Sequence, residues 1–589
     1  MKIWQMEKIT ALEQFNNRMP LEIWRWRDAL INEHLPIVSD LVATYARDCR
    51  SSGYSRANAH LRDMDAELQV PVYTPLGIGL GRSASATMGD DEICDLAKQA
   101  ADWCRDSVDQ CDGDLVLASY QCEEHCGDHG VKWPLKLTAK DSPEKIREKI
   151  MSAMARVGCE RWWRRQLRRK YGRQVEQVLR GVGRVQKQKQ PYISDWAYRR
   201  WQHAQKRNRE LLEGMEAENE LGEVVSLADA AASSTANPHV RHSELMVRMR
   251  GYEEIANDMD LARGFFTLTA PSKYHARHHY GPRNSNYNGA SPDQVQGYLS
   301  KVWARIRARW AKHGIKPFGF RVVEPHHDGT PHWHLWLFFC DADVKQAEAD
   351  FMELACAEDW EEIAEKPSVR AEVKWLEKGE SATGYIAKYV SKNITGDHLG
   401  DMGDIEGECQ GKEGAKRATA WASLWGIRQF QQIGAISVTV WRELRRRGDF
   451  TAGGIDGLGD IPHFEAIRDA ADAGDWRTFV ELMGGPQCKR KEQAIRPQQL
   501  PHCKTNAYGE EVDRLRGVIM RGAARFIRTR LHEWTVRRNG VQQEPGQVVP
   551  GDAAELVRGA DMGAPVVASP SRSEKALAEW RARKGSGEA

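Results

Sequence analysis

The sequence predicts an α+β fold, in which a central antiparallel sheet is flanked by helical N-terminal and C-terminal regions. Between about residues 246 and 450, short strand-like runs alternate with amphipathic helical patterns. The dipeptide Asp328-Gly329 supplies turn chemistry between two of these runs, which indicates a hairpin. Helical patterns predominate before and after this region. We therefore expect one sheet domain between two largely helical parts.

The central region contains a definite order of strands and helices. Apolar runs rich in aromatic and β-branched residues indicate strands, and Ser-Pro-Asp at residue 291 marks the start of a helix. The expected elements are a strand at 264–270, a basic loop at 273–288, a helix at 291–313, strands at 318–324 and from 332 onward, a helix near 343–364, a short strand at 371–375 and a helix after 381.

Changes in composition along the chain indicate its further divisions. Small polar residues suggest a linker, and Gly, Pro, Ala and charge without apolar periodicity suggest disorder. The expected divisions are an N-terminal region at 1–145 whose role the sequence does not indicate, a basic helical DNA-binding segment at 146–227, a linker at 228–245, the sheet domain at 246–450, a helical C-terminal region at 451–538 with helices at 464–483 and 511–538, and a largely disordered tail at 539–589.

The overall composition is that of a soluble protein with several domains. The chain has 589 residues, of which 41% are hydrophobic and 29% charged, so it can bury a core. No apolar run approaches the roughly 20 residues that span a bilayer, and the segment after Met1 lacks the apolar core of a secretory signal. We expect a cytoplasmic protein that does not act at a membrane.

A strongly basic segment lies between Arg161 and Arg209, although the whole chain has a net charge of only +2. This segment contains 16 Lys and Arg against two acidic residues, a net charge of +14. Interleaved arginines and aromatics suit a nucleic-acid surface, since guanidinium groups hold phosphates and rings stack on bases. The alternative is a solvated basic face with its tryptophans in the core. The candidate DNA-binding residues are Arg164, Arg165, Arg168, Arg169, Lys170, Arg199 and Arg200.

The segment E-P-H-H-D-G-T-P-H-W-H at 324–334 carries a candidate metal site. On a strand, His332 and His334 point to one face and Trp333 to the other. If the hairpin is centred on Asp328, Glu324 lies across from His332 on the same face, about 5 Å away. Glu324 is therefore the predicted third ligand. Two histidines in the predicted turn, His326 and His327, compete with it for this position.

A second chemical motif is G-Y-I-A-K-Y-V-S-K at 384–392. Tyr385, Lys388, Tyr389 and Lys392 occur at i, i+3, i+4 and i+7, which places two phenols and two ammonium groups on one face of a helix. A tyrosine pair at this spacing is, taken alone, more often a pair of core aromatics. The spacing alone leaves open whether Tyr385 and Tyr389 are core aromatics or candidate nucleophiles.

The twelve cysteines include one cluster with several metal-binding residue types, formed by Cys111, Cys122, His125 and Cys126. Its spacing matches no common zinc ribbon closely. Reduced thiols on helices and a loop are the preferred interpretation, because a reducing compartment disfavours disulfides. Whether the cluster binds zinc stays open at this point.

In this order, a His-hydrophobe-His strand followed by a Tyr-x3-Tyr helix resembles the HUH endonuclease superfamily, specifically its rolling-circle replication initiators. The sequences F-F-T-L-T-A-P-S at 265–272, W-G-I-R-Q-F-Q-Q-I-G at 425–434 and V-W-R-E-L-R-R at 440–446 are more specifically similar to the replication gene A proteins of tailed bacteriophages. The similarity covers roughly residues 150–450. It implies a phage replication initiator that acts in the cytoplasm of the bacterial host.

The resemblance implies that a tyrosine attacks one strand of origin DNA, single-stranded or supercoiled, forms a 5′-phosphotyrosine link and leaves a 3′-hydroxyl primer. The second tyrosine would serve the later rejoining of the displaced strand. The expected cofactor is Mg²⁺ or Mn²⁺, because oxygen and imidazole ligands suit these ions. No complete Walker motif occurs, so we expect the protein to depend on a host replicative helicase and polymerase.

Three other kinds of protein are alternatives. A two-tyrosine transposase of the rolling-circle type has the same motifs in the same order. A two-histidine, one-carboxylate iron enzyme shares the ligand set but needs neither paired tyrosines nor a basic segment. A DNA-binding protein without catalysis would not need intact histidines and tyrosines.

Overall fold

The computed structural model describes residues 12–73, 79–278, 282–377, 380, 393–394, 411–434, 436–446, 461–501 and 505–539. Its helices in the N-terminal half are α2 (Leu21–Glu33), α3 (Val38–Leu68), α4 (Asp90–Gln110), α5 (Leu115–Asp128), α6 (Pro143–Val157), α7 (Glu160–Gly181), α8 (Asp195–Glu213), α9 (Leu227–Ser233) and α10 (Pro238–Asp258). The later helices are α11 (Pro292–Lys312), α12 (Val344–Ala355), α14 (Gly411–Trp425), α15 (Val438–Leu444), α16 (Ile461–Ala473) and α17 (Trp476–Leu482).

The strands form several antiparallel sheets, which with the helices confirms the α+β class. The strands are β1 (Gln69–Tyr73), β2 (Gly79–Ser85), β3 (Met215–Asn219), β4 (Val224–Ser226), β5 (Ala262–Leu268), β6 (Phe318–Pro325), β7 (Pro331–Phe339), β8 (Ala371–Leu376), β9 (Phe430–Ile433), β10 (Ile495–Pro501), β11 (Asp513–Met520), β12 (Ile527–Arg528) and β13 (Trp534–Arg538). Within the described ranges the largest sheet has five strands, in the order β8-β5-β7-β6-β9, and every neighbouring pair is antiparallel.

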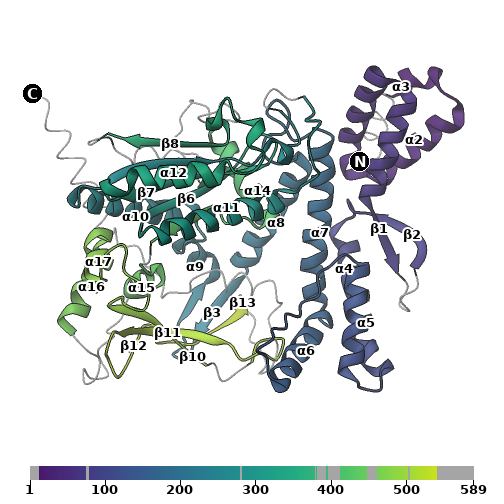
Figure 1. Cartoon of the computed structure of the whole chain (residues 1–589). Helices are drawn as coiled ribbons and strands as arrows, with labels where there is room; N and C mark the ends of the chain where they lie inside the picture. The colour runs from purple at the N-terminus through teal and green to yellow at the C-terminus, as the bar shows by residue number, and fades with distance from the viewer. Residues whose placement is uncertain are drawn as a thin grey trace, which may run out of the picture.

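Both faces of this sheet are covered by helices (Figure 1). Alternate side chains of β7, from Trp333 to Phe339, pack into one hydrophobic core with α11 and α12. The intervening residues Trp336 and Phe338 pack into a second core with α10 and with α15 to α17. Burial on two faces explains why apolar residues occur on both faces of β6 and β7, instead of alternating with polar ones. Packing on both faces therefore fixes the position of the side chains at the ends of the strands.

Helix α7 runs between the N-terminal helices and the sheet domain (Figure 1). It packs against α3, α4 and α6 on one side and against α14 on the other. Its buried residues include Trp162, Trp163, Leu167 and Tyr171, which belong to the same core as one face of the sheet. The basic segment is thus a structural bridge as well as a charged surface.

The predicted elements of the sheet domain are largely present. Strands at 262–268, 318–325, 331–339 and 371–376 and the helix at 292–312 match the expectation. The predicted helix near 343–364 ends earlier, at Ala355, and Asp359 then adopts a left-handed conformation with φ 52°. An α-helix cannot pass through a residue in that conformation.

Two predictions of secondary structure outside the sheet domain are wrong. Residues 511–538 form β11, β12 and β13 rather than a helix, and a Cβ at Gly517 would lie 2.0 Å from the Ile527 carbonyl oxygen of the paired strand. Residues 228–245, the expected linker, contain most of α9 and the start of α10. Asn237 caps α10 by accepting from the His239 N–H, and Pro238 occupies the first turn. Asn237 and Pro238 therefore mark a helix start within the expected linker.

No described helix combines the length and apolar character that crossing a bilayer requires.

Candidate metal centre

The hairpin of β6 and β7 places the predicted metal ligands side by side. Glu324 pairs directly with His332, and Val322 pairs with His334, in the predicted register. Because side chains alternate along a strand, Glu324, His332 and His334 share the face opposite to Trp333. The indole of Trp333 instead donates to Gln296 of α11 at 2.9 Å.

The three side chains form a buried cluster of ligand atoms. His332 Nε2 and His334 Nε2 lie 4.0 and 3.9 Å from Glu324 Oε2, and 2.8 Å from each other. One candidate ligand atom from each residue lies within 4.8 Å of the others, and the three side chains are at most 8% exposed. Among the described residues, this is the one group of three or more such side chains at metal-binding distance.

The outer nitrogen of each imidazole contacts a neighbouring polar group. His332 Nδ1 lies 2.7 Å from His326 Nε2, and His334 Nδ1 lies 3.3 Å from the Thr267 hydroxyl on β5. The ring of Phe265 stacks on His334 with a centroid distance of 5.3 Å. These contacts orient both Nε2 atoms toward Glu324, an arrangement that metal-bound histidines commonly show.

The donor set fits a divalent cation. Two imidazoles and one carboxylate in a buried cluster would hold a positive ion with oxygen and nitrogen ligands. When Nε2 coordinates, Nδ1 carries the proton, and the Thr267 hydroxyl is placed to accept it from His334. The two competing turn histidines lie elsewhere: His326 is against the outer side of His332, and His327 Nε2 lies 3.2 Å from the His278 carbonyl oxygen.

Asn393 is a site residue that the sequence analysis missed. Its side-chain Nδ2 donates to Glu324 Oε1, and its Oδ1 accepts from Gln429 Nε2 at 3.2 Å. The Asn393 backbone oxygen accepts from the Thr419 hydroxyl of α14 at 3.3 Å. The one available signal was its position directly after Lys392, at the end of the predicted tyrosine motif.

The turn before His332 is held from α7 and α14. The fully buried Arg180 donates from Nε to the Asp328 backbone oxygen at 2.8 Å and from Nη2 to the Thr330 hydroxyl at 3.2 Å. Trp421 donates from its indole to the Gly329 oxygen at 2.8 Å. Gly329 has φ 79°, and a Cβ there would lie 2.9 Å from the Tyr192 carbonyl oxygen. Turn geometry and close packing both require glycine.

Asp328 is an ionised carboxylate inside this turn. Burial disfavours its charge, but the charge of His275, a hydrogen bond from His275 and the charge of Arg180 outweigh burial and hold the Asp328 pKa well below its usual range. Its Oδ1 accepts from the Thr330 N–H at 3.0 Å and its Oδ2 from the Ala276 N–H at 2.9 Å. The carboxylate thereby ties the turn to the loop after β5.

The predicted nucleophile motif, Tyr385, Lys388, Tyr389 and Lys392, lies outside the described residues. Asn393 and Ile394 follow it directly and are described, with Ile394 in the second hydrophobic core. The structure thus fixes where the chain emerges from the motif, next to Glu324.

The predicted DNA-binding side chains lie on α7 and α8 in different environments. Arg168 donates from Nε and Nη2 to the two Asp90 oxygens at 2.7 Å each, and Arg165 donates to the Tyr508 hydroxyl at 3.3 Å. Burial lowers the pKa of Lys170 and of Arg200. Arg169 and Arg199 are exposed, and Arg164 is half-buried beside Cys94. DNA contact by the seven residues stays a prediction, to which the two exposed arginines are best suited.

The cysteine cluster of the N-terminal region has other contacts. His125 stacks on Trp103 with a centroid distance of 4.1 Å, and Cys111 donates weakly to Gln121 Oε1 at 3.5 Å. Burial lowers the pKa of His125 to about 4. Within the described ranges these residues form no three-ligand group at metal-binding distance, and Cys111, Cys122 and Cys126 are in no disulfide.

Comparison with known proteins gives related sequences from phages and prophages. "Replication gene A protein" of Escherichia phage 186 is 43% identical over 397 residues, which are 66% of this chain and 56% of that protein. "Probable replication protein P12" of Pseudoalteromonas phage PM2 is 38% identical, over 69% of this chain and 62% of that protein. "Probable replication endonuclease from prophage-like region" of Escherichia coli O6:H1 is 33% identical, over 70% of this chain and 52% of that protein.

The chain spans between about half and three fifths of the length of these relatives. No solved structure matches it. The family model described as bacteriophage replication gene A protein matches residues 88–397, so the match starts earlier than the expected position near 150 and includes α4 to α6. Since this match covers more than half of the chain and contains Glu324, His332 and His334, the chain belongs to the bacteriophage replication gene A protein family.

Proposed function

We propose that this protein is a metal-dependent replication endonuclease that nicks one strand of DNA at a phage origin by tyrosine attack. The five-stranded sheet is, in this proposal, the central sheet of an HUH endonuclease domain. The observation that carries the proposal is the convergence of Glu324, His332 and His334 in one buried cluster, joined through Asn393 to the tyrosine motif.

The residues divide the work as follows. Glu324, His332 and His334 would hold Mg²⁺ or Mn²⁺, and the ion would supply Lewis-acid polarisation of the scissile phosphate. Tyr385 or Tyr389 is the nucleophile. A free phenol has a pKa near 10 and needs help at neutral pH, so Lys388 and Lys392 favour its phenolate and the charge that develops in the transition state.

The reaction is a transesterification that conserves the number of phosphodiester bonds. The phenolate oxygen forms a bond to phosphorus, the bond from phosphorus to the 3′-oxygen breaks, and the 3′-oxygen takes up a proton. The products are a 5′-phosphotyrosine and a free 3′-hydroxyl that primes synthesis. Attack by a 3′-hydroxyl on the phosphotyrosine reverses the step and rejoins the displaced strand.

Connectivity supports placing the tyrosines at this cluster. Tyr389 precedes Asn393 by four residues, so the covalent chain cannot separate their Cα atoms by more than about 14 Å. Asn393 itself touches Glu324. Two phenols four residues apart in the sequence provide one nucleophile for the first cut and one for the cut after a full circuit of replication.

The family match favours this proposal over the alternatives from the sequence. The relatives are named as replication proteins or replication endonucleases rather than transposases. A two-histidine, one-carboxylate iron enzyme would leave the adjoining tyrosines and lysines without a role. The partners proposed with this function are origin DNA and the host replicative helicase and polymerase, and the place of action is the cytoplasm of the bacterial host.

The test is cleavage of labelled single-stranded origin DNA with Mn²⁺ or Mg²⁺, analysed on a denaturing gel. We expect a covalent protein–DNA band that requires metal and persists in one or both of Tyr385→Phe and Tyr389→Phe but not in the double variant. His332→Ala and His334→Ala should abolish it.

A matched control is Tyr120→Phe, because Tyr120 is an exposed tyrosine on α5, outside the cluster. This variant should retain full activity. Cleavage without a covalent adduct would mean that water is the nucleophile and would overturn the tyrosine mechanism.

A further inference from the structure

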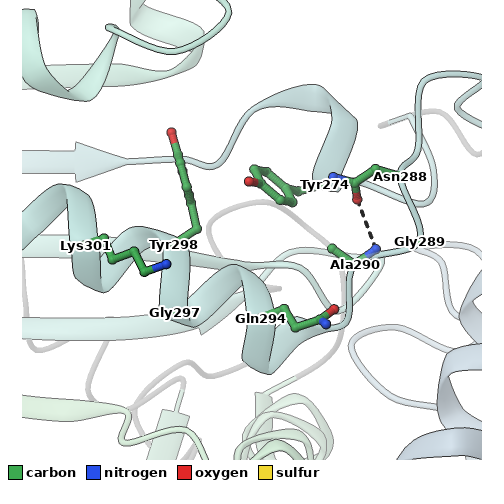
Figure 2. A pocket seen from close by; sticks show the side chains of 8 residues that line it. All are labelled: Tyr274, Asn288, Gly289, Ala290, Gln294, Gly297, Tyr298 and Lys301. Atoms are coloured by element: carbon green, nitrogen blue, oxygen red, sulfur yellow. Dashed lines mark hydrogen bonds between the residues drawn. The ribbon is translucent and has the colours of Figure 1, made fainter.

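A pocket of about 660 Å³ opens between α11 and the loop after β5. Figure 2 shows Tyr298 and Tyr274 side by side, between Lys301 and the loop that carries Asn288 and Ala290. The ring centroids of the two tyrosines are 5.0 Å apart and their planes are inclined by 36°. The pocket has the size of an ordinary small-ligand site.

The α11 wall of the pocket is a single stripe of the helix. Gln294, Gly297, Tyr298 and Lys301 occur at i, i+3, i+4 and i+7 and therefore share one face. A Cβ at Gly297 would meet nothing within 4 Å, so the missing side chain leaves open space beside Tyr298. Gln294 uses its Oε1 to accept from the Ser291 N–H at 2.8 Å, which leaves its amide N–H groups as donors.

The two phenols are suited to binding rather than to nucleophilic attack. Burial, with a smaller contribution from the Glu358 carboxylate, raises the pKa of both Tyr274 and Tyr298. Both phenols are therefore neutral at physiological pH. A pair of neutral rings with amide and ammonium donors beside them is a surface on which a nucleobase stacks.

The pocket is joined directly to the turn of the metal hairpin. The Tyr274 backbone oxygen accepts a hydrogen bond from the Thr330 hydroxyl at 3.3 Å, and Thr330 is two residues before His332. The next residue, His275, contacts His326 at a centroid distance of 5.1 Å, and His326 contacts His332. The buried Arg180 connects the hairpin turn to the pocket. It donates from Nε to the Asp328 backbone oxygen in the turn, and its Nη1 lies 3.4 Å from the Ala290 backbone oxygen at the pocket.

Positively charged side chains extend from the pocket along the surface of α11. Lys301 and Arg305 are exposed and one helical turn apart, and neither forms an ion pair within the part of the chain that the structure describes. Such cations beside an aromatic pocket provide phosphate contacts next to a base contact.

From this arrangement we infer that the Tyr274–Tyr298 pocket binds an unstacked base of the DNA strand that is cut, with Lys301 and Arg305 on the adjoining phosphates. The inference rests on the proposed function, because it makes the pocket a second contact to the same strand. Through this contact, α11 determines which nucleotide of the strand reaches the metal centre.

The test measures binding without chemistry, in the presence of a metal chelator. The probes are a fluorescent oligothymidylate and a strand of abasic sugar phosphates of the same length. We expect wild type to prefer the strand with bases. Gly297→Leu fills the pocket and should weaken binding of oligothymidylate about 5- to 100-fold, the range of one base stacked on an aromatic ring, and leave binding of the abasic strand unchanged.

Ala308→Leu is the matched control, because Ala308 is an exposed small residue three turns further along α11. Ala308→Leu should retain the preference for oligothymidylate over the abasic strand. Tyr298→Phe should also retain this preference, since the ring remains, whereas Tyr298→Ala should lose it.

Equal binding of both strands by wild type, or an unchanged preference in Gly297→Leu and Tyr298→Ala, would overturn the pocket assignment. Failure of the proposed function would look different. In that case the base preference would persist, yet no metal-dependent covalent adduct would form.

Discussion

The Asn393 side-chain amide donates a hydrogen bond to the Glu324 carboxylate. Glu324 is on β6 of the central sheet, whereas Asn393 directly follows the predicted tyrosine motif in the sequence. The other end of the amide accepts from Gln429, whose backbone oxygen accepts from Val323, the residue before Glu324, at 2.7 Å. The carboxylate, the amide and the sheet therefore form one closed hydrogen-bonded unit.

The first prediction is that Asn393→Ala weakens metal binding at the cluster. Without the amide, Glu324 loses the donor that fixes its orientation, and outer-sphere partners of this kind typically contribute 10- to 100-fold in metal affinity. Calorimetric titration of Mn²⁺ measures the change directly, without DNA. Asn286→Ala, in an exposed loop position, is the control and should bind Mn²⁺ as wild type does. Equal affinities of Asn393→Ala and wild type would show that the amide does not position the carboxylate.

The second prediction is that Arg180→Met destabilises the protein and Arg169→Met on the same helix does not. Arg180 is fully buried, and its loss leaves the Asp328 oxygen and the Thr330 hydroxyl without their donor. Each buried acceptor that loses its partner costs about 1–3 kcal/mol, whereas substitution of an exposed side chain such as Arg169 changes stability by about 0.5 kcal/mol or less. Thermal unfolding should show the difference as a lower Tm. Equal Tm values would contradict a structural role for this arginine.

The metal hairpin was predictable because its information is local. A two-residue period, an Asp-Gly turn and a His-x-His pair fix both the register and the face, so the pairing of Glu324 with His332 follows from sequence alone. The role of Asn393 was not predictable, since its contact to Glu324 spans 69 residues and no period or spacing encodes it. The structural role of Arg180 was not predictable either, because nothing in the sequence of the basic segment distinguishes this buried arginine from the exposed ones.

The errors outside the sheet domain have a related origin. Residues 511–538 were predicted to form a helix, but strand pairing decides the structure of this segment. Gly517 permits the close approach of Ile527 across the ladder.

The third prediction separates the exposed arginines of the basic segment from the paired ones. Arg169 and Arg199 are exposed, so replacing each by Gln should lower the salt dependence of single-stranded DNA binding by about 0.7 in the slope of log affinity against log salt. Arg168 forms a two-point ion pair with Asp90. Arg168→Gln should therefore change the slope less. Affinity measured over a series of salt concentrations gives all three slopes.

An unchanged slope in the Arg169→Gln, Arg199→Gln double variant would remove these two side chains from the DNA interface. A larger change in Arg168→Gln than in Arg169→Gln would show that the Asp90 ion pair opens when DNA binds.

The fourth prediction concerns the pH dependence of stability through Glu176 of α7. Burial is the largest cause that raises its pKa to about 7, while the Ser194 hydroxyl and N–H donate to its carboxyl oxygens. The unfolded value is 4.5. Between pH 4.5 and 7 the folded protein binds this proton and the unfolded chain does not, so this group lowers the free energy of unfolding as pH rises through that window. Above about pH 7 the effect is constant.

Glu176→Gln isolates this contribution, because glutamine stays neutral, and its oxygen can accept from the Ser194 N–H while its NH2 group donates to the Ser194 hydroxyl. Relative to this variant, wild type should lose on the order of 3 kcal/mol of stability between pH 4.5 and 7. The difference in Tm between the two proteins, measured at several pH values, reports the change and cancels the titration of distant groups. Glu213→Gln at an exposed position should show no such trend. A wild-type protein that gains stability relative to Glu176→Gln as pH rises would mean that Glu176 is held as a carboxylate, with the Ser194 donors and Arg180 outweighing its burial.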